Sequence, residues 1–213
     1  PPAKRRGVRD AIEITPWVEH PDRAAFEREF GLEPAVPVIG VVAQLIRRKG
    51  HHILLEALPD VLAGLPDAQV LFFGKGPQEA ALEAAIREGG LTGQVRLAGF
   101  RNDLPRWLPC LDLVVHLAFM EGLGVSLLQA SCAGVPIVAS RVGGSPEAVA
   151  DGVTGLLVEP GNAGALAAAL RRLLGDADQR HRLGRAGRER VEREFSAERM
   201  VEGNLAVYRE LMQ

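Results

Sequence analysis

Residues 121–140 read EGLGVSLLQASCAGVPIVAS: one acid, closely spaced glycines, a helix-forming run and an apolar strand, in that order. Another apolar strand, at residues 111–116, comes directly before them. Glycines at a strand-to-helix junction let backbone N–H groups approach an anion at a helix N-terminus. The Glu121 carboxylate can accept hydrogen bonds from hydroxyls. The stretch therefore predicts a site for a sugar attached to a nucleoside diphosphate, and a merely solvated Glu121 is the alternative.

Apolar strands and helix-forming segments alternate along most of the chain. Strands are expected at residues 38–45, 69–73, 95–98, 111–116, 136–139 and 155–158. Helices are expected at residues 23–30, 50–63, 78–88, 163–174, 179–184, 186–195 and 196–211. This alternation is typical of an α/β protein. It predicts a Rossmann-like, doubly wound parallel sheet with helices on both faces and a C-terminal helical extension.

The composition is that of an ordinary folded protein. With 213 residues, 47% of them hydrophobic and 24% charged, the chain can build a core without disulfides or metals. A net charge of −2 gives no reason to expect nucleic acid. Cys110 and Cys132 sit in apolar runs and are read as buried thiols in a reducing compartment. We therefore expect a cytoplasmic protein, with no metal and no cofactor.

Ligands of such sheets bind outside the carboxyl ends of the strands. The loop at 44–50 carries Arg47, Arg48 and Lys49, cations that can neutralise phosphate oxygens, and a solvated basic turn is the alternative. Glycines at 74 and 76 resemble a phosphate loop but favour a tight turn.

Two aromatic side chains near these strand ends can each be interpreted in two ways. Phe100, or the backbone of Arg101, is a candidate lining of a base pocket, and burial of Phe100 in the core is the alternative. For His116, at the end of a strand, packing is favoured over chemistry.

Taken in order, the loops resemble the donor-binding half of GT-B retaining glycosyltransferases, in the large family with sucrose-synthase-like and mannosyltransferase members. The resemblance rests on the pairs KG at 49–50 and GF at 99–100, and on EGLG at 121–124, AGVP at 133–136, GGSPE at 143–147 and DGVTGLLV at 151–158. It implies three parts: a linker and crossover segment at 1–19, a nucleotide-sugar-binding domain at 20–195, and a C-terminal helix at 196–213.

The resemblance implies a role for each matching residue. Lys49 would contact the donor diphosphate, and Glu121 would bind sugar hydroxyls and orient the anomeric carbon. Phe100 and Arg101 would flank the base. Backbone N–H groups near sugar and phosphate are expected from Gly122, Leu123 and Gly124. The other expected contacts to the donor come from Gln44, Arg48, Gly74, Val125 and Gln129.

Two of these positions depart from the family pattern. Gln44 stands where an Arg usually clamps the diphosphate, and Gln129 stands where a second Glu usually binds the ribose hydroxyls. An amide oxygen still accepts a hydrogen bond but lacks the charge-assisted strength of a carboxylate. The departures predict weaker donor binding, or a phosphate contact shifted to Arg47 or Arg48.

The resemblance also implies partners. A UDP-sugar is the first expectation for the donor and a GDP-sugar the next, and the acceptor is not identified. The parent enzyme would be bacterial and would carry an acceptor-binding N-terminal domain that this chain lacks. The fragment alone would bind nucleotide or nucleotide sugar with little activity.

Three alternatives stay open. A degenerate, non-catalytic nucleotide-binding or interaction domain is the main one, and a GT-B-fold epimerase is less favoured because its hydrolytic carboxylates are not evident. The arginine-rich segment 180–193 is interleaved with glutamates. That pattern favours a solvated helix face over a membrane patch, with peripheral membrane association of the parent as the lesser reading.

Overall fold

The computed structural model describes residues 21–212, so the expected linker and crossover segment at 1–19 lies outside the described residues. Six strands form one sheet in the order β3-β2-β1-β4-β5-β6, and every neighbouring pair is parallel. The strands are β1 Val38–Val42, β2 Gln69–Phe73, β3 Val95–Gly99, β4 Leu113–His116, β5 Ile137–Ser140 and β6 Gly155–Val158. This is the strand order of a Rossmann-like sheet, and the predicted fold class is confirmed.

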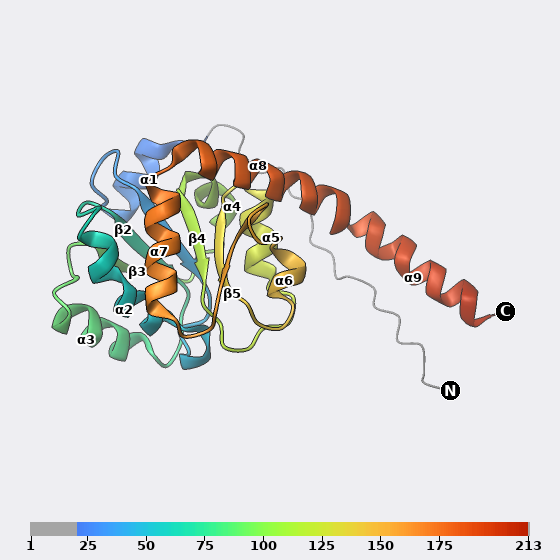
Figure 1. The fold of residues 1–213 in the computed structure, drawn as a ribbon, viewed down its shortest axis with the longest axis horizontal. Helices are drawn as coiled ribbons and strands as arrows, with labels where there is room; N and C mark the ends of the chain where they lie inside the picture. The colour runs from blue at the N-terminus through green and yellow to red at the C-terminus, as the bar shows by residue number, and fades with distance from the viewer. Residues whose placement is uncertain (1–20, 213) are drawn as a thin grey trace.

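Helices cover both faces of the sheet (Figure 1). One face packs against α2 His51–Leu62, α3 Glu79–Glu88 and α7 Ala163–Leu174. The other packs against α1 Arg23–Phe30, α4 Leu104–Trp107, α5 Val125–Cys132 and α6 Ser145–Ala148. Helix α8 Ala177–Glu194 contributes to both cores, with Leu183 in the first and Val191 in the second. Two short 3-10 turns, η1 Arg47–Lys49 and η2 Leu108–Cys110, lie between these elements.

The central strands are mostly apolar because each serves two cores. In β2, Val70 and Phe72 enter the core under α2, while Leu71 and Phe73 enter the core under α5. All four are at most 2% exposed. Successive side chains of a strand point to opposite faces, so a sheet covered on both faces needs a continuous apolar run rather than an alternating one.

One expected helix break is wrong. The pattern predicts separate helices at 179–184 and 186–195, but α8 continues through Gly184 to Glu194. A Cβ at Gly184 would lie 1.9 Å from the carbonyl oxygen of Gly134. The glycine therefore allows α8 to approach the loop after α5 closely, and it does not end the helix.

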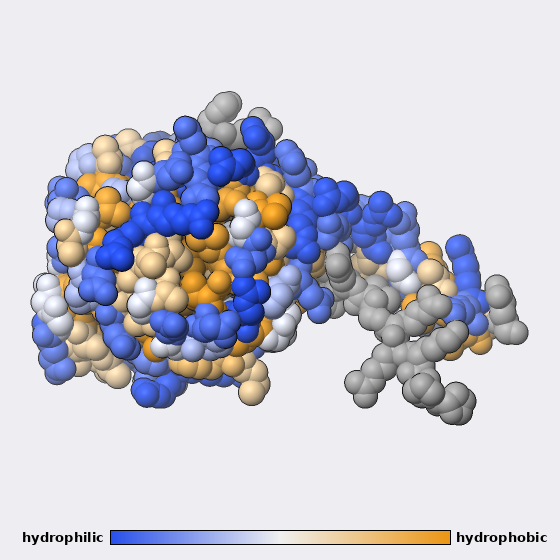
Figure 2. Space-filling model, viewed as in Figure 1, coloured by the Kyte–Doolittle hydropathy of each residue, from blue (hydrophilic) through white to orange (hydrophobic). Residues whose placement is uncertain are grey.

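The last helix, α9 Ala197–Leu211, projects away from the body of the domain (Figure 1). Its N-cap is Ser196, whose hydroxyl accepts from the backbone N–H of Arg199 at 3.4 Å. No residue of α9 is buried. Its exposed apolar side chains include Val201, Leu205 and Tyr208, and Figure 2 shows hydrophobic surface beside hydrophilic surface on this projecting end.

Candidate functional site

The loops after β1 and β4 lie against each other at the carboxyl ends of the sheet. The backbone N–H of Phe119 donates to the carbonyl of Arg48 at 2.8 Å. Gly50 has a φ of 71°, and a Cβ there would lie 2.1 Å from the carbonyl oxygen of Leu117. Only glycine permits both the positive φ and this approach. The close contact brings η1 beside the loop that carries Glu121.

Lys49 and Glu121 form an ion pair across these two loops. The Lys49 Nζ donates a short hydrogen bond to Glu121 Oε2, and each side chain is 14% exposed. Burial raises the pKa of Glu121, but hydrogen bonds from Lys49 and His116 outweigh it and hold that pKa below its usual value. Glu121 is therefore an ionised acceptor at neutral pH, placed next to a cation.

His116, the last residue of β4, also reaches Glu121. Its Nε2 lies 2.6 Å from Glu121 Oε2, and the side chain is 3% exposed. The sequence favoured packing for this residue, and the structure finds a buried side chain that is also bonded to the candidate acid. Its position at a strand end, five residues before Glu121, is the signal in the sequence that points to this contact.

The loop after β5 packs against the backbone of Glu121 and Gly122. The N–H of Gly144 donates to the carbonyl of Gly122 at 2.8 Å. Gly143 has a φ of 49°, and a Cβ there would lie 1.9 Å from the carbonyl oxygen of Glu121. In the sequence these glycines stand out only as part of the GGSPE motif at 143–147, which does not indicate that they hold the backbone of the acid.

Gly122, Leu123 and Gly124 lead from the acid into α5. Gly124 has a φ of 78° and no side chain caps the helix. Among residues 21–212, no acceptor is bonded to the N–H groups of Val125 and Ser126. Unused N–H groups at a helix N-terminus attract anions, and the exposed Val125 marks where such an anion can approach.

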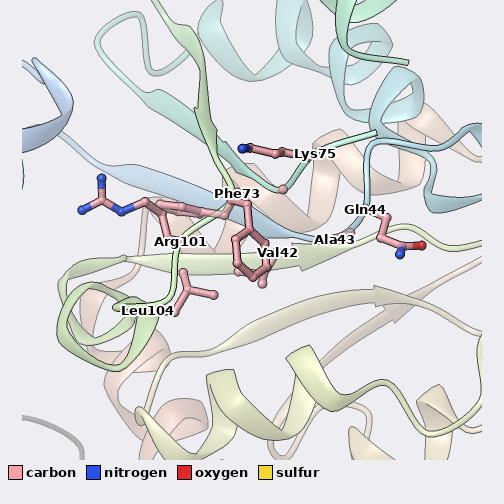
Figure 3. A pocket seen from close by; sticks show the side chains of 9 residues that line it. Val42, Ala43, Gln44, Phe73, Lys75, Arg101 and Leu104 are labelled. Carbon is pink, nitrogen blue, oxygen red and sulfur yellow. The ribbon is translucent and has the colours of Figure 1, made fainter. Parts of the chain in front are cut away.

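A cavity of about 410 Å³ opens at the carboxyl ends of β1, β2 and β3 (Figure 3). The strand β1 ends at Val42, so residues 43–45, expected as the end of the first strand, belong to the loop that follows it. The lining is mostly apolar, with one amide and two cations at its edge. Its residues are Val42, Ala43, Gln44, Phe73, Gly74, Lys75, Phe100, Arg101 and Leu104.

Phe100 lines this cavity and is 64% exposed, so the alternative that places it in the core is wrong. The guanidinium of Arg101 is directed to carboxylates instead. It donates to Asp103 at 2.7 and 2.8 Å and pairs with Glu29 at 2.8 Å. The Arg101 contact, despite opposing desolvation, lowers the pKa of Asp103 to about 2. Arg101 therefore shapes the rim of the cavity while its charge is already neutralised.

The remaining predicted residues divide into two groups. Gln44 and Gly74 belong to the cavity, and Arg48 is exposed on the 3-10 turn next to Lys49. Gln129 is half-buried on α5 and does not line the cavity. The structure thus brings the predicted residues into a charged cluster around Glu121 and an apolar cavity beside Gln44.

Residues 21–212 hold neither a membrane-spanning helix nor a cluster of metal-ligand side chains. None of their helices combines the length and the hydropathy needed to cross a membrane. They contain no group of three or more histidine, cysteine, aspartate or glutamate side chains able to hold a metal ion.

The sequence matches the family described as glycosyl transferases group 1 over residues 22–190. It is 35% identical, over 190 residues, to a GDP-mannose-dependent monoacylated alpha-(1-6)-phosphatidylinositol monomannoside mannosyltransferase of Corynebacterium glutamicum, covering 85% of this chain and 49% of that protein. It is 32% identical to the 2-deoxystreptamine glucosyltransferase of Streptomyces kanamyceticus, covering 94% of this chain and 55% of that protein. The chain thus spans about half the length of these relatives.

Solved structures have a similar fold. Anabaena Alr3699/HepE in complex with UDP and glucose superimposes with a TM-score of 0.85 at 25% identity, covering 98% of this chain and 56% of that one. The C-terminal domain of a glycosyl transferase group 1 family protein, LpcC of Francisella tularensis, gives a TM-score of 0.78 at 25% identity, covering 87% of this chain and 99% of that one. The resemblance to the C-terminal half of a GT-B enzyme is confirmed.

Proposed function

Because the chain belongs to the family of group 1 glycosyl transferases, we propose that it is the donor-binding domain of an enzyme that transfers a sugar from a nucleoside diphosphate sugar with retention of configuration. One observation carries the proposal: the partly buried ion pair of Lys49 and Glu121 lies at the carboxyl ends of adjacent strands β1 and β4. A cation for phosphate and an acid for hydroxyls are thereby placed side by side.

Each part of the donor has a proposed place. The base occupies the cavity between Phe100 and Phe73, whose mostly apolar walls suit a flat ring. The diphosphate lies between Lys49 and the N-terminus of α5, with Arg48 and Gln44 at its edge. The sugar hydroxyls bond to Glu121. In this arrangement Lys49 stabilises the charge that develops on the leaving diphosphate.

We also propose which nucleotide sugar is the donor. A UDP-sugar is the first proposal, supported by the Anabaena structure with UDP and glucose. A GDP-sugar is second, supported by the GDP-mannose-dependent relative of Corynebacterium. The cavity of about 410 Å³ is large enough to admit either base.

The acceptor is proposed to bind a domain outside this chain, since the relatives are about twice as long. Residues 20–195 would form the donor domain, and the helix in 196–213 would pack its apolar side chains on the other domain. Alone, the fragment would turn over little. The phosphatidylinositol monomannoside in the name of the Corynebacterium relative supports peripheral membrane association of the parent.

A bacterial, cytoplasmic protein remains our proposal for the source and location. The relatives from Corynebacterium and Streptomyces support the first part. Cys110 and Cys132 are both buried, and burial raises the pKa of the Cys110 thiol to about 11. Such a thiol stays protonated and unreactive, as suits a reducing compartment.

A second candidate function is a degenerate domain that binds nucleotide without catalysis. Gln44 and Gln129 favour it, because they remove one cation and one acid from the expected donor site. The retained Lys49–Glu121 pair favours the enzyme domain.

Titration calorimetry of the 213-residue chain with UDP-glucose, GDP-mannose, UDP and GDP tests the proposal. We expect binding of at least one nucleotide, and tighter binding of its sugar-bearing form. Binding of a nucleotide without any preference for the sugar would favour the degenerate domain. No heat of binding from any of the four ligands at millimolar concentration would contradict both functions.

A further inference from the structure

One imidazole links three elements of the candidate site. His116 ends β4, and its Nε2 lies 2.6 Å from Oε2 of Glu121 in the following loop. On the other side of the ring, Nδ1 lies 3.3 Å from the hydroxyl oxygen of Ser126, in the first turn of α5. The ring is 3% exposed. A strand, a loop and a helix are thus joined through one side chain.

The partners decide which ring nitrogen carries the proton. The ionised Glu121 can only accept, so Nε2 must donate to it. In a neutral ring Nδ1 is then an acceptor, and the Ser126 hydroxyl donates to it. The charged or titratable groups that face the ring are Lys49 from η1, Glu121 from the loop and His51 from α2.

The ring is neutral at physiological pH. Burial and then the charge of Lys49 lower the pKa of His116, and the contact with Glu121 opposes them without reversing the direction. A neutral ring with Nε2 protonated has a fixed donor and a fixed acceptor. It therefore holds Glu121 in one orientation, which a flexible ammonium cannot do.

Lys49 and His116 bond to the same oxygen of Glu121. Both reach Oε2, whereas within residues 21–212 Oε1 accepts only from the N–H of Gly122, at 3.1 Å. Under the proposed function, Lys49 also serves the diphosphate. When its ammonium turns toward phosphate oxygens, His116 remains the side chain that keeps Oε2 in place.

We propose that His116 is a positioning residue for the donor sugar: it holds Glu121 through Oε2 and leaves Oε1 to accept from a sugar hydroxyl, while Ser126 sets the tautomer of its ring. This inference rests on the proposed function of the site. It assigns to His116 and Ser126 a part in recognising the sugar, and no part in binding the nucleoside diphosphate.

Two substitutions of His116 separate positioning from packing. His116→Leu fills the buried strand end with an apolar side chain but removes the donor. His116→Gln restores an N–H donor that can reach Glu121. The matched control is His181→Leu, because His181 is exposed on α8 near the amino ends of β4 and β5. The three variants and the unmodified chain are titrated with UDP-glucose, UDP, GDP-mannose and GDP.

We expect His116→Leu to weaken binding of the nucleotide sugar about tenfold, as for the loss of a hydrogen bond to a charged group. Binding of the nucleoside diphosphate should change less than about twofold. His116→Gln should recover most of the loss, and His181→Leu should match the unmodified chain. Equal weakening of both ligands, or no recovery with Gln, would overturn the positioning role.

A measurement without ligand tests the tautomer independently. Long-range ¹⁵N–¹H spectra of the imidazole rings should show His116 neutral at pH 7 with Nε2 protonated, and Ser126→Ala should reduce that preference. Protonation at Nδ1 instead would overturn the inference whatever the chain binds. If the unmodified chain binds none of the four ligands, the proposed function fails and the sugar-positioning role fails with it. Binding with equal losses in His116→Leu rejects only the latter.

Discussion

Gly143 lies so close to Glu121 that a Cβ on the glycine would be 1.9 Å from the carbonyl oxygen of the acid. The contact joins the loop after β5 to the loop after β4. Since Gly143 also has a φ of 49°, two separate reasons require glycine at this position. The backbone of the candidate sugar-binding acid is therefore held by a residue 22 positions away in the sequence.

Gly143→Ala should displace the Glu121 loop. We expect the free energy of unfolding to fall by about 2–3 kcal/mol, from strain at positive φ and from the clash. Binding of a nucleotide sugar should weaken as well. Urea unfolding and calorimetry measure the two effects.

Gly152→Ala is the matched control, because Gly152 has a φ of 74° and no atom of the described residues would lie within 4 Å of its Cβ position. It should lower the free energy of unfolding by only about 1 kcal/mol and leave donor binding unchanged. Equal effects of the two substitutions would show that the contact with Glu121 is unimportant.

Lys49→Ala and Glu121→Ala should affect different ligands. Lys49→Ala removes the cation proposed for the diphosphate, so UDP and UDP-glucose should both bind roughly tenfold more weakly. Glu121→Ala removes the hydroxyl acceptor, so it should mainly abolish the preference for UDP-glucose over UDP. Calorimetry with both ligands checks this division, and equal losses for both ligands in both variants would refute it.

Gln44→Arg should strengthen binding of a nucleoside diphosphate. Gln44 borders the cavity and is exposed, so an arginine there can reach phosphate oxygens. We expect an affinity increase of about three- to tenfold that shrinks as salt rises. Gln94→Arg adds the same charge just before β3, at the amino end of the strand, and should have no such effect. If both variants gain equally, the gain reflects net charge alone.

The Asp103 carboxylate should make its full contribution to stability above its unfolded pKa and lose it as pH falls through its folded pKa. Its pKa falls from 3.8 to about 2 in the folded chain, chiefly because of Arg101. A lowered folded pKa means that the contribution is fully present above pH 4 and is lost as pH falls toward 2. Since the side chain is 41% exposed, we expect less than about 1 kcal/mol.

Asp103→Asn should therefore lower the unfolding free energy at pH 7 and flatten its decline between pH 4 and 2. Urea unfolding across this range measures the effect. Asp67→Asn, on an exposed loop, is the control. An unchanged acid limb in Asp103→Asn would contradict the assignment of the lowered pKa to this group.

Removal of residues 197–213 should leave the domain as stable as before. No residue of α9 is buried, so its loss exposes little apolar surface. Two valines of the C-terminal helices give a sharper comparison. Val191→Ala on α8, where Val191 is 1% exposed, should cost about 1–3 kcal/mol, whereas Val201→Ala on α9, where Val201 is 51% exposed, should cost less than about 0.5.

Thermal unfolding and urea titration of the truncated and substituted chains measure these changes in stability. A loss above about 2 kcal/mol on removal of α9 would show that the helix packs on this domain. Stability that is unaffected agrees with the proposal that its apolar side chains serve another domain.

Local patterns alone predict the sheet and most of its helices. In β2 the four residues after Gln69 are all apolar because Val70 and Leu71 point into different cores, and this continuous pattern distinguishes a buried parallel strand. The bounds expected for α1 and α7 agree with the structure. The helix break expected at Gly184 in α8 is wrong, because a glycine that ends a helix and one that permits close packing look the same in a sequence.

For the candidate site too, some features follow from the sequence and others depend on the tertiary structure. Its loops follow from the rule that parallel strands present their carboxyl ends at one edge, so Lys49 and Glu121 are candidates before any coordinates are known. The contacts of His116 with Glu121 and Ser126, and of Gly143 with the backbone of Glu121, needed the tertiary structure. Residue types and spacing report what a segment does by itself. Which side chains hydrogen-bond to the same oxygen of Glu121 depends on how separate loops pack against one another, and no local sequence pattern indicates this.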